Sequence, residues 1–434
     1  MDTNINPDKR LTADLLDFLG NSPLSYQAVA NVAARLEQNG FIALDRADKW
    51  NLARGGRYYV TVNGTALFAF IVADSEAPAP FHIIAAHSDS PGFRIKPHPF
   101  MLGDGGIARI NTEVYGGPIL YTWFDRPLSV AGRIAVRGDD PLSPVFRNVR
   151  CGRPLLTIPH LAIHYNRSVN DGNPLSRQRD MLPVMGYVSD ALEADRLLFE
   201  ALGVAPDEVV DYDLGLYDTT APCTLGIRDE FISAGRIDDL SMVHAGLTAL
   251  LDAAGDTSSA SRVLAVFDNE ETGSGTKQGA GSPVLAQLME RINMAIGGNS
   301  EDYLRSVARS FMISADNAHG VHPNYVDKQD PTNHPMLGGG PVIKFNANCK
   351  YMTDADSAAV FAALCERAGV PCQRFVNHSD VAGGSTLGNI LTSQVPLRGV
   401  DMGAAMWAMH SCRETSSALD HAYTVSAFTE FYKL

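Results

Sequence analysis

The sequence predicts an α/β protein with a mostly parallel sheet and helices on both faces, interrupted by an inserted β-rich domain. After residue 236, strand-like and helix-like segments alternate, as they do when parallel strands are connected by helices. Between residues 92 and 235, helical periodicity is scarce, and short β-rich pieces alternate with Gly, Pro and Asp turns. We therefore expect a split α/β domain of residues 1–91 and 236–434 around an insertion of residues 92–235.

The composition narrows the class of protein. Of the 434 residues, 45% are hydrophobic and 19% are charged, which is typical of a folded globular chain. The net charge of −14 argues against nucleic acid and anionic membrane as partners. The six cysteines form no C-x-x-C pair, no signal peptide is visible, and the longest apolar run (66–73) is too short to span a bilayer. These features favour a cytoplasmic location.

Local patterns place the elements in order. Before the insertion we expect helices at 11–19 and 26–38, a hairpin of strands 58–62 and 66–72 across Asn63-Gly64, and a buried strand at 81–86. Within the insertion we expect β-rich pieces at 107–114, 128–136 and 155–164, an exposed loop at 170–180 and helix near 190–202. After it we expect strands at 262–267, 311–315, 342–346, 373–376 and 397–400, and helices at 239–253, 282–296, 301–310, 356–368, 385–391 and 416–432.

Residues of the metal-binding type follow the predicted strand 81–86. His87 is followed two residues later by Asp89, a spacing that suits a metal ligand and a partner that fixes its tautomer. Taken alone, a His-x-Asp at a strand end is more often a turn with a structurally satisfied histidine. The pattern gains weight because open α/β sheets bind ligands beyond the carboxyl ends of their strands, which is where these residues fall.

Four later stretches repeat this pattern of acids or His near strand ends or helix starts: Asp238-Asp239, Asp268 to Glu271, Asp316 and His410. Each has a structural alternative, such as a helix N-cap or a solvated acidic loop. Together, two His and three carboxylates (His87, Asp238, Glu271, Asp316, His410) exceed the needs of one catalytic zinc but suffice for two divalent ions if one carboxylate bridges. Mixed nitrogen and oxygen ligands suit Zn²⁺, Mn²⁺ or Co²⁺.

Two metals are a known arrangement for hydrolysis, and one further carboxylate is then needed to move the proton. Glu270 and Glu271 are neighbours, and neighbours in extended backbone point to opposite sides. One of them can ligate while the other acts as a base. Spacing alone leaves open which does which.

The motifs AAHSDSPGFRIKP, GRIDDL, FDNEETGSGT, SADNAHGVHPNY, GGSTLG and MHSCRE resemble the aspartyl aminopeptidase family over essentially the whole chain. This resemblance implies a zinc exopeptidase fold and removal of N-terminal Asp or Glu from peptides. It implies that His87 and Asp316 bind one zinc, Glu271 and His410 the other, and that Asp238 bridges. It also makes Glu270 the general base for a bridging water, with Asp89 orienting His87.

The resemblance further implies a substrate pocket formed by Lys344, Tyr351 and His319, in which the Lys344 cation pairs with the substrate carboxylate. From the sequence alone, a Lys in this strand serves equally well as an edge charge that discourages aggregation. The Gly-rich turn Gly383–Thr386 lacks the spacing of a nucleotide site and is expected to form a tight turn or to place N–H groups near the substrate.

The family resemblance also implies a homo-oligomer, a tetrahedral dodecamer built from dimers, in which the insertion dimerises and His164 reaches the neighbour's active site. A strand histidine with a local partner is the structural alternative for His164. Two other functions compete: a related co-catalytic hydrolase such as a carboxypeptidase or N-deacylase, and a non-catalytic scaffold. The scaffold would be expected to have a broken ligand set, whereas all five ligands and Glu270 are present.

Overall fold

The computed structural model describes residues 8–434 and separates into two compact units. The first unit runs to Asp89 and continues with Pro222–Met409 and Glu414–Leu434. The second, the inserted unit, consists of Ser90–Ala221 and the short segment His410–Arg413. The inserted unit therefore ends before residue 235, and a short piece of the C-terminal chain packs with it.

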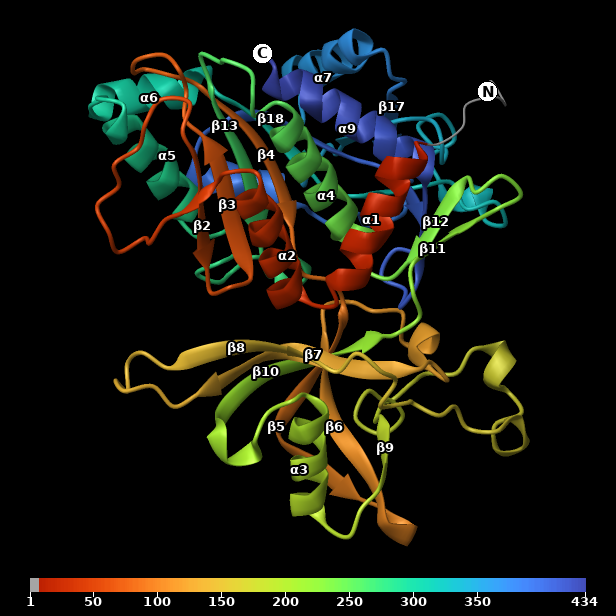
Figure 1. The fold of residues 1–434 in the computed structure, drawn as a ribbon. Coiled ribbons are helices and arrows are strands. Elements are labelled where there is room, and N and C mark those ends of the chain that lie inside the picture. Colours follow the sequence, from red (N-terminus) through yellow and green to blue (C-terminus); the bar gives the residue numbers. More distant parts are fainter. Residues whose placement is uncertain (1–7) are drawn as a thin grey trace. The chain divides into compact units, whose positions relative to one another are not determined.

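A nine-stranded sheet organises the first unit (Figure 1). Its central strands β13, β4, β14 and β18 are parallel neighbours, while β3 and β16 pair antiparallel to this centre. The predicted α/β class with a mostly parallel sheet is confirmed. In spatial order the strands are β1 (Ile42–Ala43), β2 (Arg57–Val62), β3 (Ala66–Ile71), β13 (Ser261–Phe267), β4 (Phe81–His87), β14 (Phe311–Ala315), β18 (Arg398–Gly403), β16 (Val342–Phe345) and β17 (Gln373–Val376).

The predicted hairpin and core strand are both present. β2 and β3 pair antiparallel with Val62 opposite Ala66, so the loop is Asn63, Gly64 and Thr65, one residue longer than the predicted two-residue turn. The positive φ values of Asn63 and Gly64, 59° and 70°, allow the tight turn. In β4, Ile84 packs into the core on one face of the sheet and Ile83 into the core on the other. A strand covered on both faces is apolar throughout, which explains the unbroken run seen in the sequence.

Helices cover both faces of this sheet. One face packs against α1 (Lys9–Asn21), α2 (Ser25–Gln38), α4 (Ile237–Asp252), α7 (Ala355–Ala368) and α9 (Ala418–Tyr432). The other packs against α5 (Val284–Ala295), α6 (Ser300–Arg309) and α8 (Leu387–Gln394). None of the helices within residues 8–434 is long and apolar enough to cross a membrane.

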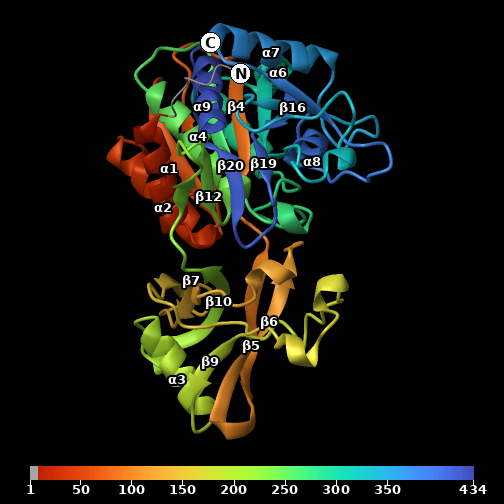
Figure 2. The same cartoon turned by 90° about the vertical axis from the view of Figure 1, so that its right-hand side faces the viewer.

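A second, five-stranded sheet in the first unit is absent from the sequence prediction. It consists of β11 (Cys223–Leu225), β12 (Phe231–Ala234), β20 (Glu414–Ser417), β19 (Ala405–Trp407) and β15 (Ala318–His319). Figure 2 shows β12, β20 and β19 side by side. Because β12 pairs with β20, residues 222–235 belong to the first unit rather than to the insertion.

The inserted unit contains a six-stranded antiparallel sheet and one helix, α3 (Ala191–Ala201). Its strands, in spatial order, are β8 (Val145–Arg150), β7 (Leu128–Val136), β10 (Val209–Asp218), β5 (Gly92–Leu102), β6 (Ile107–Tyr115) and β9 (Val184–Tyr187). The β-rich piece expected at 155–164 forms only isolated bridges and then a short 3-10 turn at Ile163–Tyr165. His164 is therefore on an exposed turn, and its placement in a strand was wrong.

Candidate metal centre

Three neighbouring parallel strands carry predicted site residues beyond the same edge of the sheet. β13 and β4 end in register, with Phe267 opposite His87. β14 pairs with β4 on its other side and ends at Ala315, so that Asp316 follows directly. The acidic segment Asp268–Glu271 follows β13 in the same way. The topology thus gathers residues that are far apart in the sequence.

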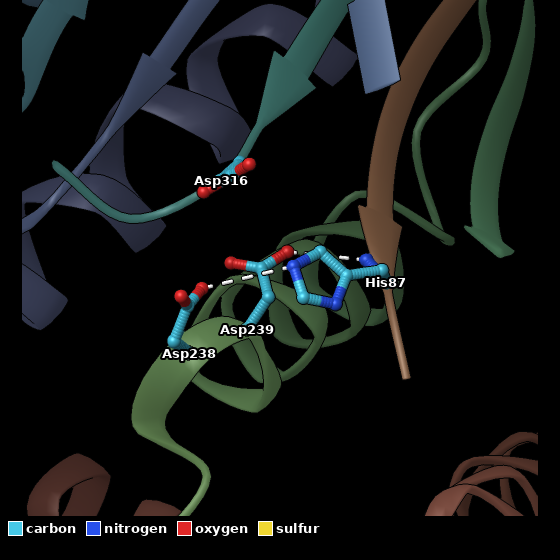
Figure 3. A group of neighbouring side chains, drawn as sticks. All are labelled: His87, Asp238, Asp239 and Asp316. Atoms are coloured by element: carbon cyan, nitrogen blue, oxygen red, sulfur yellow. Dashed lines mark hydrogen bonds and ion pairs between the residues drawn. The ribbon is translucent and has the colours of Figure 1, made fainter. Parts of the chain in front are cut away.

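His87 is held so that one ring nitrogen faces the carboxylates. The ring is almost fully buried, and its Nδ1 lies 3.0 Å from the carbonyl oxygen of Asp89 and 3.4 Å from Asp89 Oδ1. Its Nε2 lies 3.7 Å from Asp238 Oδ1 (Figure 3). Contacts of this kind at Nδ1 fix the tautomer that leaves Nε2 as the ligand atom.

The Asp89 carboxylate connects two of the strand ends. Its two oxygens accept hydrogen bonds from the backbone N–H groups of Glu270 and Glu271, each at 3.1 Å. These two glutamates open a short 3-10 turn, Glu270–Thr272, just beyond β13. Asp89 thereby positions both His87 and the turn that carries the two candidate glutamates.

Two successive acids lie at the start of α4, and both are buried (Figure 3). Arg236, the residue before the helix, makes no side-chain cap hydrogen bond; Asp238 and Asp239 have non-helical backbone angles, and the peptide bond between them is cis. Asp239 accepts hydrogen bonds from the backbone N–H of His87 at 3.1 Å and from the side-chain amide of Asn317 at 3.3 Å. The backbone N–H of Asp238 donates to Glu414 at 3.1 Å.

Asp239, Asn317 and Glu414 are supporting residues that the sequence analysis did not include among the site residues. All three are buried around the ligand candidates. The sequence could have indicated them, because each lies within a motif that carries a candidate ligand: IDD, ADN and HSCRE. The sequence does not show which backbone or side-chain group each of these three residues binds.

Lys344 lies against a candidate ligand. Its Nζ is 3.2 Å from Asp316 Oδ1 and 5.7 Å from the centre of the Tyr351 ring, and its side chain is 4% exposed. β16 lies between β18 and β17, so Lys344 is not on an edge strand, and the aggregation-control alternative is wrong. His319 is on β15, three residues after Asp316, and its ring centre is 6.2 Å from that of Phe375.

The candidate ligand atoms are close enough to share metal ions. One ligand atom each from His87, Asp238, Asp239 and Asp316 lie within 4.8 Å of one another, and the same holds for His87, Glu270 and Glu271. Imidazole nitrogen combined with several carboxylate oxygens is a donor set that fits zinc. The residues present in the first unit therefore fit a metal centre.

The electrostatics of the cluster also favour a cation. Burial raises the pKa of the Glu270 carboxyl to about 9, with Asp316, Glu271 and Asp89 adding to the rise and His87 opposing it. Burial likewise raises the pKa of Asp239 well above its ordinary value. Several acids that repel each other in a buried site are stabilised as carboxylates when a divalent ion supplies positive charge.

Two predicted site residues, His410 and His164, belong to the inserted unit. His410 follows β19 and precedes β20, and its Nδ1 lies 3.1 Å from the carbonyl oxygen of Gly117. A contact of this kind at Nδ1 suits a histidine that ligates through Nε2. The roles of His410 and His164 remain predictions.

The fold and the site together define a metal-dependent hydrolase of the α/β class. The chain belongs to the aminopeptidase I zinc metalloprotease (M18) family, which matches residues 18–432. It is therefore a zinc metalloaminopeptidase, which argues against the carboxypeptidase, N-deacylase and scaffold alternatives. The resemblance to this family inferred from the motifs is confirmed.

Individual relatives and solved structures support the same family assignment. The chain is 48% identical to "Probable M18 family aminopeptidase 2" of Clostridium acetobutylicum, covering 97% of this chain and 98% of the relative. It is 42% identical to the protein of the same name from Pseudomonas aeruginosa, with the same coverage. Among solved structures, the "Ape4 and Nbr1 complex" matches with a TM-score of 0.94 at 33% identity, covering 99% of this chain and 88% of that one. The S. cerevisiae "mApe1 dodecamer" matches with a TM-score of 0.85 at 27% identity, covering 98% and 96%.

Proposed function

We propose that this metalloaminopeptidase removes N-terminal Asp or Glu from peptides and uses two zinc ions per chain. The observation that carries the substrate class is the buried Lys344 ammonium beside Asp316, at the edge of the metal cluster. Asp316 already pairs with this ammonium, and the side-chain carboxylate of a substrate is a suitable further partner for a buried cation. In a chain of net charge −14, such a local positive group is needed to attract an acidic residue.

Five residues would hold the two ions: His87 and Asp316 at one, Glu271 and His410 at the other, and Asp238 at both. When bound, zinc lowers the pKa of water and polarises a carbonyl; Mn²⁺ and Co²⁺ are possible substitutes. The close approach of the His87, Asp238 and Asp316 ligand atoms supports the first ion. Asp89 and Asp239 hold His87 in place.

Glu270 is the proposed general base. Its carboxylate oxygen accepts a proton from the attacking water and then delivers it to the nitrogen of the leaving amine. Its backbone is anchored by Asp89, which leaves the side chain to move the proton.

Lys344, Tyr351 and His319 form the proposed pocket for the substrate's acidic side chain. Burial alone lowers the pKa of the Lys344 ammonium, but Asp316 and the other nearby acids outweigh this effect and raise it. Lys344 therefore remains charged throughout the working pH range of an enzyme. Its proximity to the Tyr351 ring limits where the ammonium can lie.

The test of the substrate class is Lys344→Ala, with hydrolysis of Asp-, Glu- and Leu-anilides measured on metal-loaded protein. A hydrogen bond to a charged group contributes about 1.5–3 kcal/mol, so kcat/KM for the Asp substrate should fall about 10- to 100-fold while metal content and Leu cleavage are retained. Lys277→Ala, which removes an exposed lysine, is the matched control. Unchanged Asp-over-Leu selectivity in Lys344→Ala would refute the pocket.

A homo-oligomer, a dodecamer built from dimers through the inserted unit, is the proposed assembly. The structural match to a protein solved as a dodecamer supports it. The exposed position of His164 on a turn of the inserted unit is compatible with a contact to a neighbouring subunit's substrate. Fully active monomers in sedimentation-coupled assays would refute both the assembly and the role of His164.

A further inference from the structure

A buried aspartate beside the proposed pocket has no part in the functions described so far. Asp401 is on β18, between β14, which leads to Asp316, and β16, which carries Lys344. β16 and β18 pair antiparallel with Ile343 opposite Met402, so the register continued by one residue brings Lys344 opposite Asp401. Residues directly opposite each other on neighbouring strands share a face of the sheet. Asp401 is fully buried on the face that α8 covers.

Each oxygen of the Asp401 carboxylate accepts a hydrogen bond from a different loop. Its Oδ2 accepts a hydrogen bond from the backbone N–H of Met352 at 2.5 Å, directly after Tyr351. Its Oδ1 accepts a hydrogen bond from the Thr386 hydroxyl at 2.6 Å, at the end of the Gly-rich turn. The Asp401 backbone N–H also donates to the Thr353 hydroxyl at 2.9 Å. One carboxylate thus ties together two loops that are separate in the sequence.

Gly388 lets the start of α8 approach the Asp401 carboxylate closely. A Cβ at Gly388, in the first turn of α8, would lie 2.6 Å from both Asp401 oxygens, so glycine is needed there for the helix start to approach the carboxylate. A carboxylate at a helix N-terminus is favoured by the helix dipole. Burial raises the pKa of Asp401, but interactions with the Ser314 side chain, the Thr386 hydroxyl and the Met352 N–H, together with the charge of Lys344, oppose this rise.

We propose that Asp401 is a positioning residue for substrate specificity: it holds the Tyr351–Thr353 segment and the Gly383–Thr386 turn around Lys344 and so fixes the shape of the pocket for the acidic side chain. The proposal rests on the proposed function, because it assumes that Lys344 receives the substrate carboxylate. Asp401 touches neither substrate nor metal and acts through Tyr351 and Lys344.

Two substitutions, Asp401→Asn and Thr386→Val, weaken the hydrogen bonds that Asp401 makes to the two loops. Asp401→Asn keeps the size of the side chain but can accept through only one oxygen, so one of the two segments is released. Thr386→Val removes the hydroxyl donor, and Thr386→Ser restores it. Thr392→Val, which removes a hydroxyl bonded within α8 and distant from Asp401 in the helix, is the matched control.

We expect Asp401→Asn and Thr386→Val to raise KM for Asp-anilide at least fivefold, with kcat, metal content and KM for Leu-anilide within twofold of the wild type. Thr386→Ser and Thr392→Val should behave as the wild type. In a Lys344→Ala background, Asp401→Asn should change KM for Asp-anilide by less than a further twofold, because both substitutions act on the same pocket. Hydrogen exchange provides a readout without catalysis: the Met352 amide should exchange at least tenfold faster in Asp401→Asn.

Two results would overturn the inference. One is an equal loss of kcat for Asp- and Leu-anilide in Thr386→Val, which means that the contact is only structural. The other is a double variant, Asp401→Asn with Lys344→Ala, in which the increase in KM equals the product of the two single-variant increases, which means that the two residues act independently. If Lys344→Ala itself leaves selectivity unchanged, the proposed function has failed; if Lys344→Ala changes selectivity and Asp401→Asn and Thr386→Val do not, this inference alone has failed.

Discussion

Individual side chains of the centre are positioned mainly by backbone groups. Asp89 binds the N–H groups of Glu270 and Glu271, Asp239 binds the N–H of His87, and Glu414 binds the N–H of Asp238. Each carboxylate therefore locks a candidate ligand or base by its main chain, which has few ways to move. This explains why acids outnumber the ligands that two metals need.

The role of Glu270 as a base predicts the effect of Glu270→Gln. The amide has nearly the same shape but cannot take up a proton, so kcat should fall by about 10²- to 10⁴-fold. The metal content should stay at the wild-type value because Glu271 is retained. Elemental analysis and anilide hydrolysis on one sample check both points. Glu290→Gln, at an exposed helical position, is the control; loss of metal in Glu270→Gln would instead make Glu270 a ligand.

A partly buried histidine that is not a metal ligand, His82, predicts that the protein loses stability in acid. Burial lowers the pKa of His82 to about 4, with Arg262 contributing, and the ring packs 4.9 Å from that of Phe431. The unfolded chain binds a proton on this histidine below about pH 6.5 whereas the folded chain does not until about pH 4. Stability therefore falls as the pH drops through this window, by about 2 kcal/mol between pH 7 and pH 5.

His82→Phe should remove this contribution while preserving the packing. Thermal melts in excess zinc at pH 7 and pH 5 measure it: the drop in Tm between the two should be smaller in His82→Phe than in the wild type. His334→Asn, at an exposed position, should leave the drop unchanged. An equal drop in His82→Phe and the wild type would show that His82 does not contribute.

At the scale of elements, α4 is the helix whose placement decides the site, because it begins with Asp238 and Asp239. It packs closely on the central strands: a Cβ at Gly246 would lie 2.7 Å from the Leu264 side chain and 3.2 Å from that of Ile84. Small residues at such a contact let a helix approach a sheet, and an added methyl group requires the Leu264 side chain, the Ile84 side chain or the helix to move.

Gly246→Ala is therefore expected to destabilise the protein by about 1–3 kcal/mol, despite the better helix propensity of alanine. Tm and zinc affinity should both fall, since the shift of α4 moves its first turn. Gly255→Ala is the control, because no atom lies within 4 Å of a Cβ built there. A Gly246→Ala variant as stable as the wild type would contradict the close packing.

The elements differed in how well the sequence predicted them. The β2–β3 hairpin and strand β4 have unambiguous signals, namely Asn63-Gly64 and a continuous apolar run. The five-stranded sheet was missed because its strands are short and one, Glu414–Ser417, consists of polar residues that are buried by distant partners. His164 was placed in a strand because its apolar neighbours mimic one, although they are exposed on a turn.

At the scale of the whole molecule, the centre depends on contacts across long stretches of chain. The Glu414 carboxylate reaches the N–H of Asp238 and the Asp89 carboxylate reaches Glu270, each over more than 170 positions. Sequence patterns identified the candidate ligands because they are local motifs after strands. They could not separate the roles of Asp238 and Asp239 or assign Glu414, because those depend on which distant groups meet.

Metal content measured together with substrate preference tests the central claim most directly. Protein purified without chelator is divided for elemental analysis and for hydrolysis of Asp- and Leu-anilide. We predict about two zinc ions per chain, which is what a two-metal hydrolase requires, and strong preference for the Asp substrate. Two ions with no cleavage of either substrate would contradict the proposed substrate class, and no tightly held metal with no rescue by added zinc, cobalt or manganese would contradict the metal centre itself.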